Sequence, residues 1–340
     1  MQYVSLNNTC SDSLPIECGV PQGSILGPLL FLIYINDLAH VSPDAISILF
    51  ADDTNVIYRS QSYETLNKII NHELTLLSAW FNENKLALNV SKTKFMIFHF
   101  RNQKPPDEFK VFLDGIELEN VKSTKFLGVM INENLSWNDH MGYIANKLSR
   151  INGVLARLKR QLPLPVMKTI YNSLFASSMQ YGISVWGGSS NKHFNRLVTL
   201  QKKAVRHITC AKFNNHTEPI FKKLKLLKLS DSYKIQCSKI LYKKKLGSLH
   251  PYHSNLLKLN SDTQDTRTRQ CFDVIMGKST VFQRINNLVF KVGHSWNDLP
   301  YDIKMLDKTS EHTFTKKVKA LYISGYSETC TIRNCYVCKT

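Results

Sequence analysis

Two adjacent carboxylates, Asp52 and Asp53, are the residues whose type and spacing most clearly suggest chemistry. Because like charges repel, an ionised pair persists best when a divalent cation such as Mg²⁺ or Mn²⁺ neutralises it. Two metal ions bound by such carboxylates can activate an attacking hydroxyl and stabilise the phosphate oxygens of the leaving group. Asp52 is the predicted primary ligand. Neighbouring residues of a strand point to opposite faces, so the side chain of Asp53 is expected to point away from that of Asp52. For an isolated pair, a solvated Asp-Asp turn is the commoner alternative.

The elements around the acids are predicted to present them at the tip of a hairpin. β-Formers fill residues 46–50 and 56–58, which predicts two short strands that meet at the pair. Upstream, Gln22 and Gly23 lie in a turn-rich segment that enters an apolar helix ending near Asn36. The missing side chain of Gly23 would let a base pair or nucleotide approach closely, although an ordinary helix-entry turn is the alternative.

Helical and strand patterns then alternate along the chain. An amphipathic helix is predicted from about residue 62 to 82, and it should cover one face of a sheet. Strands are predicted at 95–100 and 126–130, with a tight hairpin at Asp114-Gly115 between them. On their own, Phe126, Leu127 and Gly128 fit a core strand with a bulge. After residue 137 the periodicity is helical.

Four segments, in this order, resemble motifs of one family, the reverse transcriptases of non-LTR (LINE-type) retrotransposons. Residues 19–31 (GVPQGSILGPLLF) resemble motif B, and residues 50–53 (FADD) resemble motif C. Residues 86–94 (LALNVSKTK) resemble motif D, whereas residues 125–129 (KFLGV) with 135–137 (LSW) resemble the primer-grip motif E. Residues 181–187, which include Tyr181-Gly182 and Trp186-Gly187, resemble a downstream segment to which no role is assigned. Trp296-Asn297 resembles the family's C-terminal region, where it is predicted to pack a helix start.

The resemblance implies an RNA-directed DNA polymerase that extends a DNA primer on an RNA template with dNTPs. In that reading Asp52 and Asp53 bind Mg²⁺, and the residues that contact nucleotide and template are Gln22, Gly23, Phe50 and Ala51. Lys92 is a candidate for protonating pyrophosphate, with a plain surface lysine as the alternative. The primer grip would comprise Phe126, Leu127 and Gly128. The family's setting is intracellular, in the nucleus or the cytoplasm.

The fold class that follows is an α/β (α+β) palm fragment of short antiparallel strands and packed helices, followed by an all-α basic, thumb-like domain. The expected domains are a partial palm at 1–136, basic helices at 137–250, and a C-terminal region of unknown role at 251–340. The family's motif A aspartate and fingers have no counterpart before motif B. The chain is therefore expected to be the C-terminal part of a polymerase, truncated and inactive alone.

Positive charge is concentrated in one part of the chain. The formal net charge is +18, and residues 151–250 contain 19 Lys and Arg against only Glu218 and Asp231. Such an excess favours a polyanionic partner over merely solvated helix faces, because self-repulsion opposes it otherwise. Six residues are predicted to contact the nucleic-acid backbone: Arg157, Lys159, Arg160, Lys202, Lys203 and Arg206. The run Lys243–Lys245 continues the basic character.

The remaining composition favours a reduced, intracellular protein without membrane spans. Eight cysteines form no regular framework, and the longest apolar run is shorter than a membrane helix requires. Cys330, Cys335 and Cys338 lack a fourth ligand nearby, so chance thiols are favoured, and metal binding by Cys335 and Cys338 stays open. A non-catalytic nucleic-acid-binding remnant of a retroelement is the alternative function.

Overall fold

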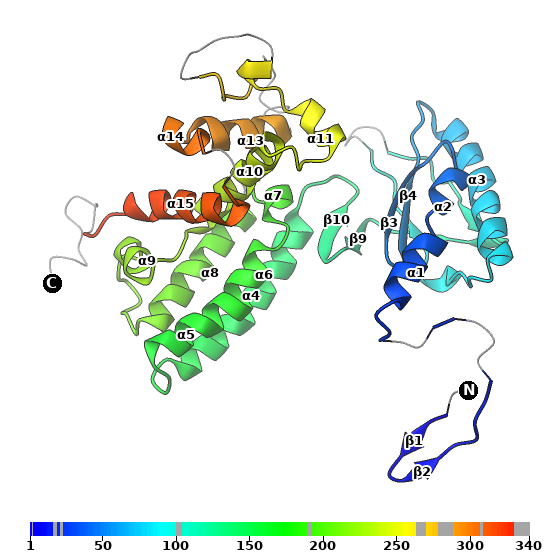
Figure 1. Cartoon of the computed structure of the whole chain (residues 1–340), viewed down its shortest axis with the longest axis horizontal. Helices are drawn as coiled ribbons and strands as arrows, with labels where there is room; N and C mark the ends of the chain where they lie inside the picture. Colours follow the sequence, from blue (N-terminus) through cyan, green and yellow to red (C-terminus); the bar gives the residue numbers. More distant parts are fainter. Residues whose placement is uncertain are drawn as a thin grey trace. The chain divides into compact units, whose positions relative to one another are not determined.

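A computed structural model of the chain describes residues 1, 3–15, 19–20, 23–99, 104–189, 192–262, 270–277, 288–306 and 309–329. Contacts divide the chain into two compact units, Met1–Lys122 and Ser123–Thr340 (Figure 1). The sequence pattern places the corresponding change after residue 136. The difference arises because the hairpin at 123–132 makes its contacts with the helices that follow it.

The first unit combines short strands with three helices. Its elements are β1 (Ser5–Leu6), β2 (Thr9–Cys10), α1 (Gly27–Tyr34), α2 (Leu38–Val41), β3 (Ile46–Phe50), β4 (Asp53–Ile57), α3 (Tyr63–Glu83), the 3₁₀ turn η1 (Val90–Lys92), β5 (Lys94–Phe95), β6 (Phe112–Leu113), β7 (Ile116–Glu117) and β8 (Glu119–Asn120). In the described residues all strands pair two by two, and only β5–β8 is parallel.

Helix α3 forms where the sequence predicts it and covers the β3–β4 hairpin. The side chain of Ser62 begins the helix by accepting a hydrogen bond from the backbone N–H of Thr65 at 3.1 Å. The buried Leu77 packs in one apolar cluster with Leu49 and Val56, one from each strand of the hairpin. The hairpin is thus held on one face by a long helix.

The Asp114-Gly115 pair forms the predicted tight turn. Leu113 pairs with Ile116 across it, and Asp114 and Gly115 have φ angles of 52° and 77°. Two positive φ angles in a two-residue loop are the signature of a type I′ turn, which Asp-Gly favours.

The second unit is mainly helical. Its elements are β9 (Ser123–Phe126), β10 (Val129–Asn132), α4 (Asn138–Leu158), α5 (Leu164–Ile170), the π-helical η2 (Tyr171–Ala176), α6 (Ser177–Gln180), α7 (Ile183–Trp186), α8 (Lys192–Ile208), α9 (Glu218–Leu224), α10 (Leu229–Lys245), α11 (Pro251–Leu256), η3 (Asn260–Asp262), α13 (Leu288–Asn297), α14 (Tyr301–Lys304) and α15 (Glu311–Ser324). One apolar core joins α4 to α5–α9, and a second joins α10 to α13 and α15. None of the described helices is both long and apolar enough to cross a membrane.

The chain reverses direction at Leu127-Gly128, so the predicted continuous strand at 126–130 is wrong. Phe126 pairs with Val129, which leaves a two-residue loop between β9 and β10. Leu127 and Gly128 have φ angles of 43° and 83°, as a type I′ turn requires. Phe126 ends one strand, and what resembles a bulge in the sequence is the tip of a hairpin.

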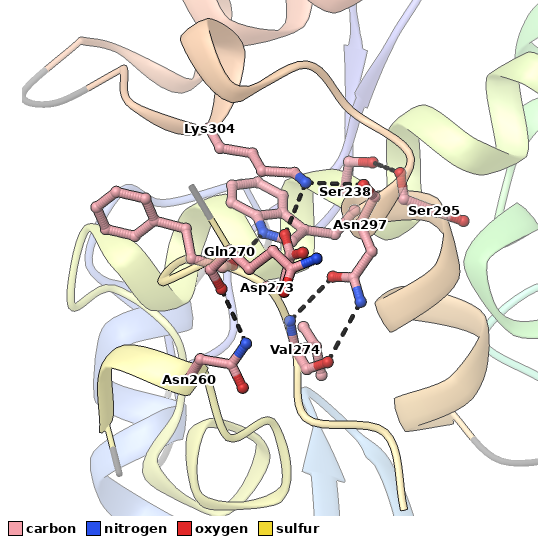
Figure 2. A network of polar contacts seen from close by, with 10 residues as sticks. Ser238, Asn260, Gln270, Asp273, Val274, Ser295, Asn297 and Lys304 are labelled. Carbon is pink, nitrogen blue, oxygen red and sulfur yellow. Dashed lines mark hydrogen bonds and ion pairs between the residues drawn. The ribbon is translucent and has the colours of Figure 1, made fainter. Parts of the chain in front are cut away.

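A polar network fixes the segment around residues 270–277 to the C-terminal helices (Figure 2). Lys304 Nζ lies 2.7 Å from Asp273 Oδ1 in an ion pair whose side chains are 6% and 20% exposed. The amide of Asn297 binds both backbone groups of Val274, accepting from its N–H at 2.9 Å and donating to its carbonyl at 3.2 Å. This network substitutes for regular secondary structure in the segment.

Trp296 and Asn297 end one helix, and Trp296 packs against the start of another. They are the last turn of α13, and Trp296 Nε1 donates to the carbonyl of Phe272 at 2.7 Å. Trp296 also stacks on Phe314 in the first turn of α15, with ring centroids 6.0 Å apart, so the prediction that this pair packs a helix start is confirmed for Trp296.

Candidate functional site

The two acids lie at the tip of the β3–β4 hairpin, as predicted. Phe50 pairs with Asp53, so Ala51 and Asp52 alone form the loop. Ala51 has a φ angle of 50°, in the left-handed region that costs a residue with a Cβ about 1–2 kcal/mol. Both carboxylate residues are exposed. Backbone strain of this kind, held by flanking strands, is typical of functional positions.

The two faces of this hairpin differ in what they contact. Leu49 and Val56 point into the cluster with α3. The opposite face carries Ile48 and Phe50, which are 39% and 61% exposed. Residues directly paired across an antiparallel ladder share a face, so Asp53 lies on the exposed face beside Phe50. An exposed aromatic ring and a carboxylate thus flank the Asp52 turn.

The turn before α1 is described only from Gly23 onward, and Gln22 lies outside the described residues. Gly23 has a φ angle of 85°, and a Cβ built there would meet no atom within 4 Å. Ser24 Oγ then accepts a hydrogen bond from the N–H of Gly27 at 3.0 Å, which closes the turn that leads into α1. Phe31 of α1 packs on the same cluster as Leu49. Motif B and motif C residues therefore share one core.

Lys92 is exposed at the end of η1. Asn89 shapes this turn, because its side-chain oxygen accepts from the backbone N–H of Lys92 at 3.2 Å. Leu88 packs between the two apolar clusters of the unit. Lys94 forms an ion pair with Glu119 at 2.7 Å. Of the two lysines, Lys92 therefore has the side chain better placed to meet a ligand. Asn89, which belongs to the segment that resembles motif D, shapes the turn that presents Lys92.

The donor chemistry at the tip fits a hard divalent cation. Carboxylate oxygens are the preferred ligands of Mg²⁺, which usually takes one or two of them and leaves its other positions to water or phosphate. No group of three or more His, Cys, Asp or Glu residues that could hold a metal occurs in the described part of the chain. Asp52 and Asp53 could thus supply part of a coordination shell. Cys330, Cys335 and Cys338 lie outside the described residues.

The β9–β10 hairpin rests on a buried histidine of α4. Nδ1 of His140 accepts a hydrogen bond from the N–H of Met130 at 3.1 Å, and the residue is 1% exposed. Burial lowers the pKa of His140 to about 4, so the ring stays neutral near pH 7 and can act as an acceptor. The turn residues of the predicted primer grip thus sit on an anchored hairpin.

Some of the residues predicted to contact the nucleic-acid backbone lie where α4 and α8 end. Burial, and the charges of Lys159 and Lys203, lower the pKa of His207, which places both lysines near this ring. Cys210 Sγ approaches the carbonyl of Lys159 at 3.0 Å, so the two helix ends are held together. Arg157, at the end of α4, is exposed. Cations at helix C-termini are also favoured by the helix dipole.

The other members of the set lie in different surroundings. Lys202 is exposed and lines a pocket of about 330 Å³ that also contains Glu218. Arg206 Nε donates to the carbonyl of Asn215 at 2.9 Å, which ties down the loop after α8. Arg160 is exposed just beyond α4. Arg206 therefore has a clear structural role, whereas Lys202 and Arg160 are free to face solvent.

Acids from the C-terminal region neutralise part of the basic segment. Lys239 and Lys243 pair with Glu311 at 2.8 and 3.5 Å, and Lys244 pairs with Asp262 at 2.8 Å. Lysines of α10 thus help to hold the C-terminal helices. A count over residues 151–250 alone missed these partners because they are distant in sequence.

Comparison with known proteins gives a family match for the first part of the chain. Residues 1–131 match the reverse transcriptase (RNA-dependent DNA polymerase) family. The match contains the Asp52 turn and the β9–β10 tip. The resemblance to reverse transcriptases that the motifs in this segment predict agrees with this match.

The relatives are retrotransposon proteins. The chain is 29% identical over 260 residues to the RNA-directed DNA polymerase from mobile element jockey of Drosophila melanogaster, covering 73% of this chain and 28% of that protein. It is 28% identical over 235 residues to the probable RNA-directed DNA polymerase from transposon X-element of the same species, covering 67% and 26%. A Pol polyprotein of retrotransposable element R1 from Bradysia coprophila is 27% identical over 175 residues, covering 49% and 17%.

The chain spans about a quarter of the length of the first two relatives. No solved structure matches it. The non-LTR retrotransposon origin predicted from the four motifs agrees with the names of these relatives.

Proposed function

We propose that the chain contributes a metal-binding hairpin, a primer-supporting hairpin and duplex-binding helices to an RNA-directed DNA polymerase of a non-LTR retrotransposon. The reaction joins a dNTP to a primer 3′-hydroxyl on an RNA template, inside the cell. The family match over residues 1–131 and the printed names of the relatives support the reaction class. The chain would be the C-terminal part of such an enzyme, with further palm and finger residues needed for turnover.

The observation that carries the proposal is the two-residue turn that presents Asp52. Adjacent carboxylates at the end of paired strands, with a strained Ala51 before them, leave both acids exposed to solvent. Asp52 and Asp53 would hold Mg²⁺, which when bound supplies positive charge to the phosphates and to the attacking hydroxyl.

The neighbouring residues have roles that follow from their positions. Gly23 leaves space for a nucleotide or base pair beside its backbone, and Gln22 is the side chain expected to contact it. Phe50 shares the exposed face with Asp53 and can pack against a base or ribose, while Ala51 sets the direction of the turn. Lys92, exposed at the end of η1, can give a proton to pyrophosphate as it leaves.

The second unit would grip the duplex. Phe126, Leu127 and Gly128 form the hairpin proposed to support the primer terminus. The exposed members of the basic set would contact phosphates from the helical region at 137–250, which we propose to be the thumb.

Affinity cleavage tests the metal site without requiring turnover. Fe²⁺ replaces Mg²⁺ in such sites, and with ascorbate and peroxide it cuts the backbone near the bound ion. We expect cuts close to residues 50–54, competed by Mg²⁺ and absent from Asp52→Asn with Asp53→Asn. Asp107→Asn with Glu108→Gln, another exposed adjacent pair, is the matched control and should cleave like the wild type. Cleavage at 50–54 that persists in the Asp52→Asn, Asp53→Asn protein would refute the metal site.

A second candidate, non-catalytic nucleic-acid binding, is favoured by the basic ends of α4 and α8. Under that function the chain binds RNA–DNA duplex with a steep salt dependence but without a metal site at the hairpin. Binding that is unaffected by Asp52→Asn, together with no cleavage at residues 50–54, would select this candidate. Binding that does not weaken with salt would reject both.

A further inference from the structure

A tyrosine of the helical layer holds the tip of the β9–β10 hairpin. The hydroxyl of Tyr181 donates a hydrogen bond to the carbonyl of Leu127 at 2.6 Å. Leu127 is the first residue of the two-residue turn, where its carbonyl is outside the strand ladder. The contact joins residues 54 positions apart, and Tyr181 is 55% exposed. It thus fixes the outer end of the hairpin at the protein surface.

Two glycines with positive φ allow the segments to approach this closely. A Cβ built on Gly128, at φ 83°, would lie 3.0 Å from Cε1 of Tyr181. A Cβ built on Gly182, at φ 61°, would lie 3.1 Å from Cγ2 of Val129. A side chain at either place would be strained by the positive φ angle and would require Tyr181 or Val129 to shift by a few tenths of an ångström. The contact therefore depends on Gly128 in one segment and on Gly182 in the other.

Tyr181 is also linked, through Trp186, to His140, which binds the strand β10 of the hairpin. Nε1 of the fully buried Trp186 donates to the carbonyl of Tyr181 at 2.9 Å. The Trp186 ring meets His140 edge to face, with ring centroids 5.5 Å apart. His140 accepts from the N–H of Met130 in β10. One connected set of contacts therefore grips the hairpin at its strand and at its turn.

We infer that the segment Tyr181–Trp186 is the positioning element of the primer-supporting hairpin, and that Tyr181 sets the direction of the Leu127-Gly128 turn. This inference rests on the proposed function of that turn. Tyr181 acts through the hairpin, so it is a positioning residue with no contact to the reacting atoms. A purely structural tyrosine would affect folding, whereas this one affects where the primer terminus lies.

Amide hydrogen exchange of the free protein tests the support directly. Tyr181→Phe removes only the hydroxyl, and a hydrogen bond worth about 1 kcal/mol predicts roughly fivefold faster exchange for amides at the turn. Tyr252→Phe removes an exposed hydroxyl elsewhere and should change nothing. Unchanged exchange at residues 127–130 in Tyr181→Phe would overturn the inference.

Photocrosslinking tests the consequence for primer placement. A primer–template duplex with 4-thiothymidine at the primer 3′ end should crosslink to peptides within residues 125–130 of the wild type. In Tyr181→Phe we expect that crosslink to fall at least about threefold, with duplex affinity within about twofold, because phosphate contacts dominate affinity. Equal crosslinking in both proteins would overturn the inference alone. If the wild type gave no crosslink at the hairpin, both the proposed primer grip and this inference would be refuted.

Discussion

Phe50 and Asp53 stand directly opposite each other across the β3–β4 hairpin, with only Ala51 and Asp52 between them. The shortness of this loop is what forces Ala51 into a left-handed conformation. Local backbone energy and the presentation of the acids are therefore linked, and substitutions at Ala51 test the link.

Substitutions at Ala51 should change stability in opposite directions. Ala51→Gly relieves the strain and should raise the free energy of local opening by up to about 1 kcal/mol. Ala51→Val introduces a β-branched side chain and should lower that free energy by about 1 kcal/mol or more. The measurement is amide exchange of the paired residues Ile48 and Asn55. The same direction of change for both variants would contradict a left-handed alanine here.

The neutral His140 predicts acid sensitivity of the second unit. Its folded pKa of about 4 lies below the unfolded value of 6.5. As pH falls from 6.5 toward 4, the unfolded chain takes up a proton that the folded chain does not, and stability falls by up to about 3 kcal/mol. Above pH 6.5 both states are neutral, and this loss is absent.

Urea unfolding between about pH 7.5 and 4.5 measures the effect of this linkage. His140→Gln keeps an acceptor near the N–H of Met130 but does not titrate, so its stability should vary less with pH. An equally steep profile for wild type and His140→Gln would assign the acid sensitivity to other groups.

The buried ion pair Lys304–Asp273 should be needed for the C-terminal segment to stay in place. Lys304→Met leaves the Asp273 carboxylate without its cation and should cost about 3 kcal/mol or more. Adding Asp273→Leu should restore part of that loss, since the uncompensated charge disappears with it. The check is urea unfolding together with exchange at residues 270–277. A single variant as stable as the wild type would show that the pair contributes little.

Phosphate contacts at the end of α8 should appear in the salt dependence of binding. Lys203→Gln is expected to weaken duplex binding and to reduce the slope of log affinity against log salt by about 1. Lys68→Gln is the matched control, because Lys68 is an exposed lysine of the first unit that pairs with Glu64. Filter binding between about 50 and 200 mM salt measures both. Equal slopes for the two variants would remove Lys203 from the interface.

Local sequence signals predicted local structure well. The acidic hairpin, the Asp114-Gly115 turn and helix α3 from its Ser62 cap all form where short-range patterns place them. Each depends on residues within a few positions of one another. The acidic turn also stands out in the sequence because two adjacent carboxylates repel each other unless a cation neutralises them.

Features made by distant partners were missed. The Leu127-Gly128 turn lacks the Asn-Gly or Asp-Gly signal, and its support, Tyr181, comes 54 residues later. The lysines of α10 seemed uncompensated because Glu311 lies far downstream. A sequence of one protein does not reveal such pairings, whereas the spatial arrangement does.

The order of these parts along the chain has a consequence for biosynthesis. A two-residue turn can close within microseconds of leaving the ribosome, but the tyrosine that aims it is made 54 residues afterwards, roughly 3 to 11 s later at ordinary elongation rates. During that interval the strands of the nascent hairpin are paired in their final register, but the hairpin is not yet held in its final orientation. Its orientation is thus completed only when the later helices emerge and pack.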